Sequence, residues 1–388
     1  MKVQTRCSRF GRHLIVPALL APILLGAKPV TKTKARLPSA PAPVFVMAYN
    51  VENLFDTEHD EGKDDWTYLP AAQKKATEYR QRCAETSSSK QRTTECEEFD
   101  WTETQLKTKL ERISKILISA NQGQCADVLV LVEIENIKVL ERLRTEFLGP
   151  CNYKPGILLE GADKRGIDTA ILSRFERTGE PVLHPVDLVS SRTKGEIRRT
   201  RDILEASLKL PNGDILTAFG IHFPAPYHPF SERLEAMETL NKAARKAAEK
   251  SHIVLAAGDF NTNAKEDSRL YRSIAAKDWQ VSHLEGCHQC LGTHFFKKEE
   301  SWSFLDSIMV WRGGQEQPQH QWTLDRDSVA VVKGFDFQTT SDGLPIGWES
   351  AAVPGQSDHL PITLQLKAGA KTKEISFNGL SGCLYHQT

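Results

Sequence analysis

Short apolar segments recur along this chain of 388 residues, and polar side chains stand at the ends of six of them. Such segments predict buried strands, and strand ends at one edge of a sheet bring distant residues together on a rigid frame. One polar strand end is commonly a turn, because Asp and Asn often follow strands. Six of them favour a functional site. The residues are Asn50, Glu133, His222, Asp259 with Asn261, Asp306, and Asp358 with His359.

The stretches between these segments carry the period of amphipathic helices. Residues 105–120 place a row of apolar side chains on one helical face. A second stretch, 231–251, predicts a long helix with Ser231 as its N-cap. Apolar strands that alternate with helices imply sheets covered by helices. We therefore expect an α/β fold over residues 44–370, without internal repeats.

Residues 57–104 interrupt this pattern with a polar, charged stretch that is poor in aliphatic residues. We interpret it as a surface insertion, tied by Cys83 and Cys96. Its acidic segments, "DEGKDDW" and "ECEEFDW", are typical of a solvated surface, because they lack the spacing of an EF-hand calcium loop.

The first 27 residues are typical of a secretory signal peptide. Four basic residues precede an apolar run, "LIVPALLAPILL", that is short for a membrane span. An uncleaved anchor is the alternative. Cleavage leaves 46 basic against 50 acidic residues, a net charge of −4, so no global positive charge indicates nucleic acid. We expect a periplasmic or secreted monomer without stable membrane insertion, with a flexible linker at 28–43 and a C-terminal tail at 371–388.

The cysteines agree with export, which favours disulfides over free thiols. Neighbours in the sequence suggest Cys83–Cys96, Cys125–Cys151 and Cys287–Cys290, with Cys383 left over, although connectivity cannot be read from a sequence. The motif "CHQC" could instead contribute to a zinc site or a redox pair. No second cysteine pair of matching spacing supports zinc.

The polar residues at the strand ends form a chemical set. Glu133 and Asp259 are hard oxygen donors that suit Mg²⁺, with Mn²⁺ or Ca²⁺ as alternatives. Such ions bind phosphate oxygens and stabilise developing charge. His359 can carry a proton or polarise a phosphate, and Asp306 could hold its ring. The set predicts metal-dependent chemistry at a phosphate.

In these motifs the chain resembles the endonuclease/exonuclease/phosphatase superfamily, which includes DNase I-like nucleases, abasic-site endonucleases, sphingomyelinases and inositol polyphosphate phosphatases. The matches run in order through "AYNVENLF", "LVLVEIEN", "GIHFPAP", "GDFNTN", "SFLDSIMV" and "SDHLPI". "GDFN" with a downstream "SDHLP" is a specific combination. The resemblance implies a four-layer α/β/β/α sandwich of two packed mixed sheets flanked by helices. It also implies metal-dependent cleavage of phosphate esters at one edge.

The resemblance further implies a metal shell and a water-activating residue. Glu133 is similar to the principal metal ligand, and Asn50 and Asp358 to further members of the metal shell. Asp259 is similar to the residue that aligns or deprotonates the attacking water. By chemistry alone Glu135 could replace Glu133; only the register of the motif selects Glu133. The family's usual Gln-Glu pair is Val-Glu here.

The remaining roles concern histidines and phosphate contacts. His359 is similar to the histidine beside the scissile phosphate, with Asp306 behind it, and Asn261 to a phosphate partner. His222 resembles the second histidine of the DNase I and sphingomyelinase branches. Asp168, in "RGIDTAILSR", is the residue that would orient His222.

Arginines supply candidate phosphate contacts outside this set. Arg199 and Arg201 lie in the run "GEIRRTR" before a predicted strand, where they could bind a phosphate backbone or head group. A solvated charge run is the alternative. The resemblance favours Arg201, and Arg233, which follows the "HFPAP" turn, is a further candidate.

Three functions remain open at this stage. An exported, Mg²⁺-dependent DNase I-like nuclease, which cleaves nucleic acid by in-line attack of water, is the first expectation. A phosphodiesterase or phosphatase acting on lipids or small phosphoesters is the second, although no hydrophobic hairpin is recognisable in the sequence. The third is a non-catalytic binding protein on the same scaffold, which is disfavoured because every principal position is filled.

Overall fold

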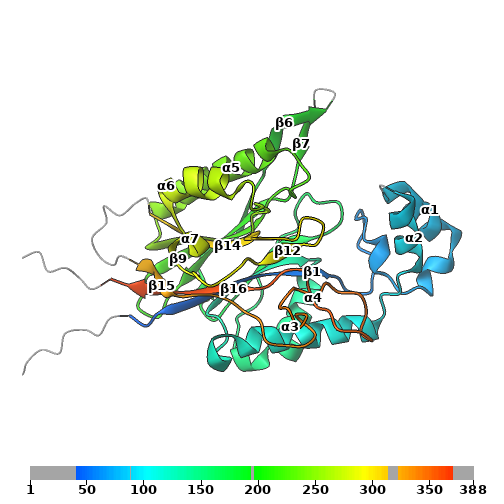
Figure 1. The fold of residues 1–388 in the computed structure, drawn as a ribbon, viewed down its shortest axis with the longest axis horizontal. Coiled ribbons are helices and arrows are strands. Elements are labelled where there is room, and N and C mark those ends of the chain that lie inside the picture. The colour runs from blue at the N-terminus through cyan, green and yellow to red at the C-terminus, as the bar shows by residue number, and fades with distance from the viewer. Residues whose placement is uncertain (1–40, 88, 194–195, 313–321, 370–388) are drawn as a thin grey trace, which may run out of the picture. The chain divides into compact units, whose positions relative to one another are not determined.

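The computed structural model describes residues 41–369, apart from 88, 194–195 and 313–321. The predicted signal peptide, most of the linker, the C-terminal tail and Cys383 lie outside the described residues. Two mixed β-sheets pack face to face, and helices cover the outer face of each sheet (Figure 1). The predicted four-layer α/β/β/α fold is confirmed.

The first sheet has five strands in the order β15-β16-β1-β2-β3. β1 runs parallel to β2 and antiparallel to β16. Along β1, Phe45 and Met47 face the outer helices, whereas Val46 and Ala48 face the second sheet. Burial on both faces explains why this strand is a continuous apolar run. The bounds are β1 Val44–Leu54, β2 Val128–Ile134, β3 Asp168–Ser173, β15 Trp322–Val331 and β16 Ile362–Ala368.

The second sheet follows the order β11-β14-β10-β9-β8-β4, with β5 also paired to β8. β10 runs parallel to β9 and antiparallel to β14, so this sheet is mixed as well. The bounds are β4 Glu176–Arg177, β5 Val182–His184, β8 Ile203–Lys209, β9 Ile215–His222, β10 Ile253–Asp259, β11 Trp279–Val281 and β14 Asp306–Trp311. Two separate two-stranded ribbons are formed by β6 Asp187–Thr193 with β7 Glu196–Arg199, and by β12 His294–Phe296 with β13 Ser301–Ser303.

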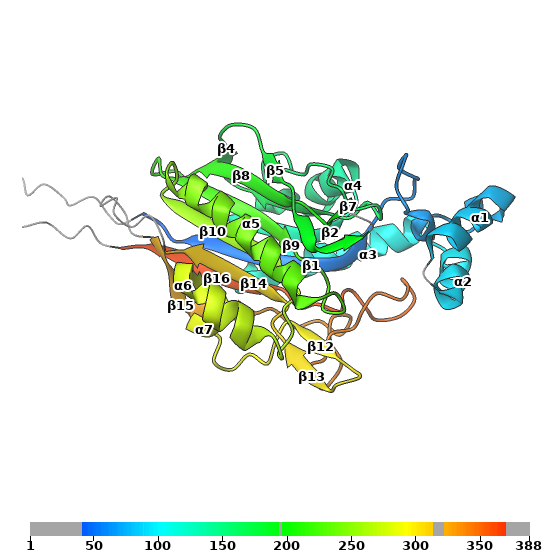
Figure 2. The ribbon, with the colours of Figure 1, turned by 90° about the horizontal axis from the view of Figure 1, so that it is seen from above.

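Helices close the two outer layers. α3 (Glu103–Gly123) buries its predicted apolar face, including Leu110 and Ile113, against the first sheet, where α4 (Ile137–Arg142) also packs. α5 (Phe230–Ala248) covers the second sheet (Figure 2). Shorter helical segments are η3 Leu143–Phe147, η4 Gly149–Cys151, η5 Ser268–Ala275, α6 Ala276–Asp278 and α7 Ser282–Glu285.

Two local expectations are wrong. The cap of α5 is Pro229, and Ser231 lies inside the first turn without a capping hydrogen bond. Proline has no side-chain oxygen, so the first N–H groups of this helix receive no side-chain cap. β1 does not end near Asn50 but continues to Leu54 through an irregularity in its pairing with β2. That irregularity shapes the functional site described below.

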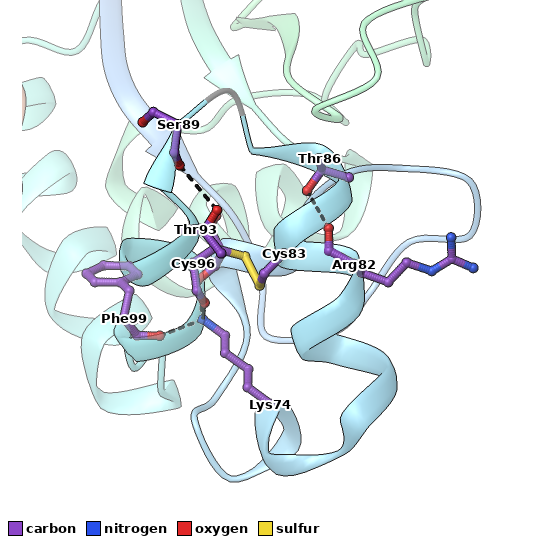
Figure 3. Close-up of a disulfide and its surroundings, with 9 residues drawn as sticks. Lys74, Arg82, Cys83, Thr86, Ser89, Thr93, Cys96 and Phe99 are labelled. Carbon is purple, nitrogen blue, oxygen red and sulfur yellow. Dashed lines mark hydrogen bonds between the residues drawn. A yellow bond between two sulfur atoms is a disulfide. The ribbon is translucent and has the colours of Figure 1, made fainter. Parts of the chain in front are cut away.

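The insertion at 57–104 has its own helical structure. It contains η1 (Trp66–Tyr68), η2 (Gln73–Lys75), α1 (Thr77–Thr86) and α2 (Lys90–Glu98). The Cys83–Cys96 disulfide joins α1 to α2, as Figure 3 shows. The structure also contains the Cys125–Cys151 and Cys287–Cys290 disulfides, so all three suggested pairs are present and "CHQC" is a disulfide loop here.

A buried lysine fixes the inner side of this insertion. The ammonium group of Lys74 donates hydrogen bonds to the carbonyl oxygens of Thr67, Cys96 and Phe99, at 2.6, 2.9 and 2.6 Å. The carbonyl groups of Cys96 and Phe99 belong to the C-terminal end of α2, next to the disulfide (Figure 3). A lysine that satisfies three backbone acceptors replaces the apolar core that this polar segment lacks.

Replacing Lys74 therefore tests what holds the insertion together. We expect Lys74→Met to lower the free energy of unfolding by about 2 to 4 kcal/mol, because three buried carbonyls lose their donor. Thermal unfolding and limited proteolysis within 57–104 measure the effect. Lys75→Met is the matched control, because Lys75 is exposed. Equal behaviour of the two variants would contradict this account.

Candidate active site

Three neighbouring strands of the second sheet deliver three polar residues to one place. In the register of β9, β10 and β14, Asp259 lies beside His222 on one side and Asp306 on the other. Gly258 makes the close approach possible. Its φ is 134°, and a Cβ atom there would lie 2.2 Å from the carbonyl oxygen of Ile221. The glycine before Asp259 is thus required by the backbone geometry.

Asn50 connects this group to the first sheet. Its amide nitrogen lies 3.1 Å from Asp259 Oδ2 and 3.4 Å from Glu133 Oε1. The ring nitrogen Nε2 of His222 lies 3.7 Å from Glu133 Oε1 and 3.8 Å from Asp259 Oδ2. The structure thus brings together four residues that the sequence predicted as one site, across more than 200 positions of the chain.

Glu133, and not Glu135, faces this cluster. Glu133 has a φ of 67°, at the irregularity between Val132 and Ile134. This turn of the backbone breaks the alternation that would have placed both glutamates on one face. Glu133 Oε2 accepts a hydrogen bond from the backbone of Asn53, whereas Glu135 Oε2 accepts one from the backbone of Asp56. The choice made from the motif register agrees with this geometry.

His359 and Asp306 form a hydrogen-bonded pair beside the cluster. The distance from His359 Nδ1 to Asp306 Oδ2 is 2.7 Å, and both side chains are buried. Burial alone would lower the pKa of His359, but the carboxylates of Asp306 and Asp358 raise it well above its ordinary value. The ring is therefore an imidazolium at neutral pH, as expected for a histidine held by a carboxylate.

His222 has the opposite character. Burial, followed by the charges of Arg201 and Arg165, keeps the pKa of His222 well below its ordinary value, so the ring is neutral. The expected contact with Asp168 is not formed. Asp168 Oδ1 accepts a hydrogen bond from the backbone of Gly161. Asp168 Oδ2 and His222 Nδ1 are both buried without a hydrogen-bond partner among the described residues. Asp168 therefore does not orient His222 by direct contact in this structure.

Asn261 supports Asp259 from the turn after β10. Its φ is 50°, its backbone N–H donates to Asp259 Oδ1 at 2.8 Å, and its side-chain amide donates to the carbonyl of Phe223 at 2.9 Å. The amide nitrogen is thus engaged with the backbone. The role of Asn261 as a phosphate partner stays a prediction.

Asp358 extends the site toward residues that the sequence did not single out. Its side chain is half exposed, and its Oδ2 lies 3.6 Å from Nε2 of His294. His294 pairs with His359 through an isolated antiparallel bridge, so two histidines flank this carboxylate. The only sequence signal for His294 is the motif "GTHFF", which carries no recognisable spacing.

Glu52 was missed as well, although it stands two residues after Asn50. Its Oε2 accepts hydrogen bonds from the backbone of Trp348 and Asp358, at 2.8 and 3.0 Å. Burial and the nearby Asp358 raise the pKa of Glu52 to about 7. Lys109, which is fully buried, donates to the carbonyl of Gln356 and adds positive charge here. Glu52 in "NVENLF" could have been found by its position beside Asn50.

The three arginines that were predicted to contact phosphate differ in burial and in their partners. Arg201 donates to the backbone carbonyls of His222 and Phe223 and pairs with Asp163 at 3.0 Å, so it braces the strand that carries His222. Arg199 pairs with Asp187 and stays largely exposed. The prediction of a phosphate contact for Arg233 is wrong. Arg233 is fully buried, and its guanidinium is engaged by Glu266 and by carbonyls of the turn after β9.

The cluster fits a divalent cation by the chemistry of its donors. Asp259 is 2 % exposed and lies near the carboxylates of Asp306 and Glu133, with His359 as the adjoining cation. Burial raises the pKa of Asp259 to about 7, and Asp306 and Glu133 contribute to that shift. Hard oxygens with excess negative charge suit Mg²⁺, Mn²⁺ or Ca²⁺. Asn50, however, turns its amide nitrogen to the carboxylates, and its Oδ1 accepts a hydrogen bond from the backbone N–H of Glu52.

Glu135 gives a pH-dependent prediction outside the cluster. Burial, followed by the charge of Asp56, raises its pKa to about 9. The folded state therefore retains a proton that the unfolded chain releases near pH 4.3. The protonated Glu135 therefore adds to the free energy of unfolding. This contribution is fully present below about pH 4 and is lost as the pH rises toward 9. Glu135→Gln should raise the free energy of unfolding at pH 8 by about 1 to 3 kcal/mol and change it little at pH 5.

Urea unfolding at both pH values measures this effect. Glu58→Gln is the control, since Glu58 is an exposed acid at the start of the 57–104 insertion. A Glu135→Gln effect that is equal at pH 5 and pH 8 would exclude the proposed proton uptake.

Comparisons with known proteins agree with this architecture. The chain matches the model of the Endonuclease/Exonuclease/phosphatase family over residues 85–368. The inositol phosphosphingolipids phospholipase C of Schizosaccharomyces pombe is 38% identical over 147 residues, which make up 35% of this chain and 33% of that protein. This match thus spans about a third of the length of that relative.

Solved structures share the fold at low identity. The mannosyl-6-phosphatase of Bacteroides thetaiotaomicron has a TM-score of 0.51 and 15% identity, covering 83% of this chain and 99% of that one. D. rerio TDP2, complexed with a single-strand DNA product, has a TM-score of 0.48 and 15% identity, covering 84% and 99%. At such identity the likeness concerns the fold alone. Because the family model matches more than half of the chain, the chain belongs to the endonuclease/exonuclease/phosphatase family.

Proposed function

We propose that the chain is an exported, metal-dependent phosphodiesterase that hydrolyses the phosphodiester of a phosphosphingolipid-type head group. The observation that carries the chemistry is the buried cluster of Glu133, Asn50, Asp259 and His222 beside the His359 imidazolium. The partial match to the yeast phospholipase C favours a lipid over the nucleic acid that we expected first.

Residues of the cluster would hold the metal and the phosphate. Glu133 is the proposed metal ligand, with Asp358 and a reoriented Asn50 as further candidates. When bound, Mg²⁺, Mn²⁺ or Ca²⁺ would neutralise phosphate charge. The His359 imidazolium then lies where it can stabilise the charge that develops on the phosphoryl oxygens. Asp306 holds that ring in place and keeps it protonated.

Asp259 is the proposed base for the attacking water. A base works best when its pKa lies near the working pH, and the pKa of Asp259 is about 7. Asn50 and the backbone of Asn261 hold one oxygen each of this carboxylate. The neutral His222, between Glu133 and Asp259, can accept a hydrogen bond from water, and the proton for the leaving oxygen can come from the His359 imidazolium. No covalent intermediate on the protein is required.

The β6–β7 ribbon supports a lipid surface as the place of action. The side chains of Val189 and Ile197 on this ribbon are 52% and 45% exposed. Tyr227, which lines the same cleft as Arg198 of β7, is 85% exposed. The sequence did not reveal such a hydrophobic hairpin. Because Arg198 and Arg199 on β7 pair with Glu232 and Asp187, the ribbon would meet a lipid interface through its exposed apolar side chains. No helix in the described part of the chain is long and apolar enough to cross a membrane.

Asp259→Asn tests the chemistry. We expect kcat to fall by about 10³-fold with ceramide phosphoinositol vesicles or with bis-p-nitrophenyl phosphate, because the base is lost. EDTA should abolish wild-type turnover, and Mg²⁺ should restore it. Asp336→Asn, an exposed site, is the control. Supercoiled plasmid is assayed in parallel, and nicking without lipid hydrolysis would select the nuclease instead.

Asp306→Asn tests the pairing behind His359. The substitution keeps the shape of the side chain but removes the charge that favours the imidazolium, so kcat should fall by about 10²-fold or more while KM changes little. Asp327→Asn on β15 is the control, because Asp327 is exposed. Unchanged kcat in a folded Asp306→Asn protein would remove His359 from the proposed mechanism.

A further inference from the structure

A large cleft lies near the cluster, between the insertion and the loops before β3, after β7 and after β9. Its volume is about 1010 Å³. One wall comes from the insertion, with Tyr68, Thr86 and Arg92. The opposite wall comes from the loop before β3 and from the end of β7, with Lys164 and Arg199. The insertion thus forms one wall of a space that the core fold alone does not enclose.

The cleft adjoins the catalytic cluster through two of its lining residues, although no residue of the cluster itself lines it. Asn53 lines it, and the backbone N–H of Asn53 donates to Glu133 Oε2 at 3.0 Å. Arg201 lines it as well, and its guanidinium donates to the carbonyl of His222. A phosphodiester held at Glu133 and His222 would therefore have one of its two substituents in this cleft.

Positive charge dominates the lining. Six basic side chains contribute to it, against three acidic ones, Asp64, Glu95 and Asp163. The basic residues are Arg92, Lys164, Arg165, Arg198, Arg199 and Arg201. Of the acidic residues, Asp163 is already paired with Arg201 at 3.0 Å. Two more of the basic residues, Arg198 and Arg199, pair with Glu232 and Asp187 outside the lining, so the cleft keeps an excess of one positive charge.

Two of these cations have no partner in the described part of the protein. The side chains of Arg92, on α2 of the insertion, and Lys164, on the opposite wall, form neither an ion pair nor a hydrogen bond among the described residues. Arg198, by contrast, pairs with Glu232, and Arg199 with Asp187. Unpaired cations on both walls of one cleft leave a binding position for an anion between them.

We propose that this cleft is the head-group subsite and that it takes a polyol head group carrying a further anionic group, such as a second phosphate. The inference rests on the proposed function and extends it to substrate choice. Hydroxyl groups of Thr67, Thr86, Ser87 and Thr200 also line the cleft and can bind sugar or polyol oxygens. The same charge excess disfavours a quaternary ammonium head group, which proteins bind with aromatic faces and acids.

The insertion is then the specificity element of this chain. It supplies Arg92 and the hydroxyls of Thr86 and Ser87, while the core supplies the reaction. Its position on the cleft depends on Lys74 and on the Cys83–Cys96 disulfide, which fix α2. Substrate choice is thus separated from catalysis, because different segments carry each of them.

Binding of released head groups tests the proposal without requiring turnover. Isothermal titration calorimetry of the mature protein compares inositol 1,4-bisphosphate, inositol 1-phosphate and phosphocholine. We expect the bisphosphate to bind about tenfold or more tightly than phosphocholine, with an affinity that falls as salt rises. Competition against bis-p-nitrophenyl phosphate hydrolysis should give the same order.

A charge-reversed variant locates the site. Arg92→Glu/Lys164→Glu should weaken bisphosphate binding by about tenfold or more, since two attractions become repulsions. The control is Arg82→Glu, an exposed arginine on α1 of the same insertion that does not line the cleft. Circular dichroism checks that the variants are folded.

The outcomes separate this proposal from the proposed function. Phosphocholine binding as tight as the bisphosphate, or a double variant that binds like Arg82→Glu, would overturn the head-group subsite even in an active enzyme. A folded wild-type protein that binds the bisphosphate as expected but hydrolyses no phosphodiester with any of the three metals would support the subsite and overturn the proposed function.

Discussion

One hydrogen bond between the two sheets organises the candidate site. Asn50 extends from the first sheet and donates to Asp259, which ends β10 of the second sheet. The two sheets approach closely behind this contact because small side chains, Ala48 and Ala257, occupy the core between them. A shift of one sheet against the other would separate Glu133 from Asp259 and His222. The packing of the sandwich is therefore a condition for the chemistry at its edge.

Backbone strain concentrates at the same edge. Glu52, Asn53, Glu133 and Asn261 all have φ values between 50° and 67°. A non-glycine residue in this region costs about 1 to 3 kcal/mol, and such residues cluster at functional sites. Three of the four lie in the last residues of β1 or β2, and Asn261 follows β10, so that a side chain or an N–H group points into the cluster. The large apolar core on both sides of the first sheet supplies the stability that offsets this cost.

Much of this arrangement could be predicted from the sequence. The apolar runs predicted the strands, and the order of motifs predicted which strand ends meet. Glu133 was separated from Glu135 only by the motif, because the positive φ that turns the two side chains apart has no signature in sequence. His294 and Lys109 were missed for a related reason, since their roles come from tertiary contacts with the segment before β16. Arg233 was misassigned, because a basic residue beside a proline-rich turn can equally close that turn.

The arginines show how position decides function among chemically identical groups. Arg233 and Arg201 use their guanidinium groups on backbone carbonyls and acids, so they hold the loops around His222 in place. Arg92 and Lys164 have no such partners among the residues that the structure describes, and they line the cleft from opposite walls. A charge that is satisfied within the protein contributes to its structure, whereas a charge that is left unpaired next to a phosphate site is available to a ligand. On this argument we propose that the cleft between the 57–104 insertion and the loop before β3, and not the shared catalytic edge, selects the phosphodiester.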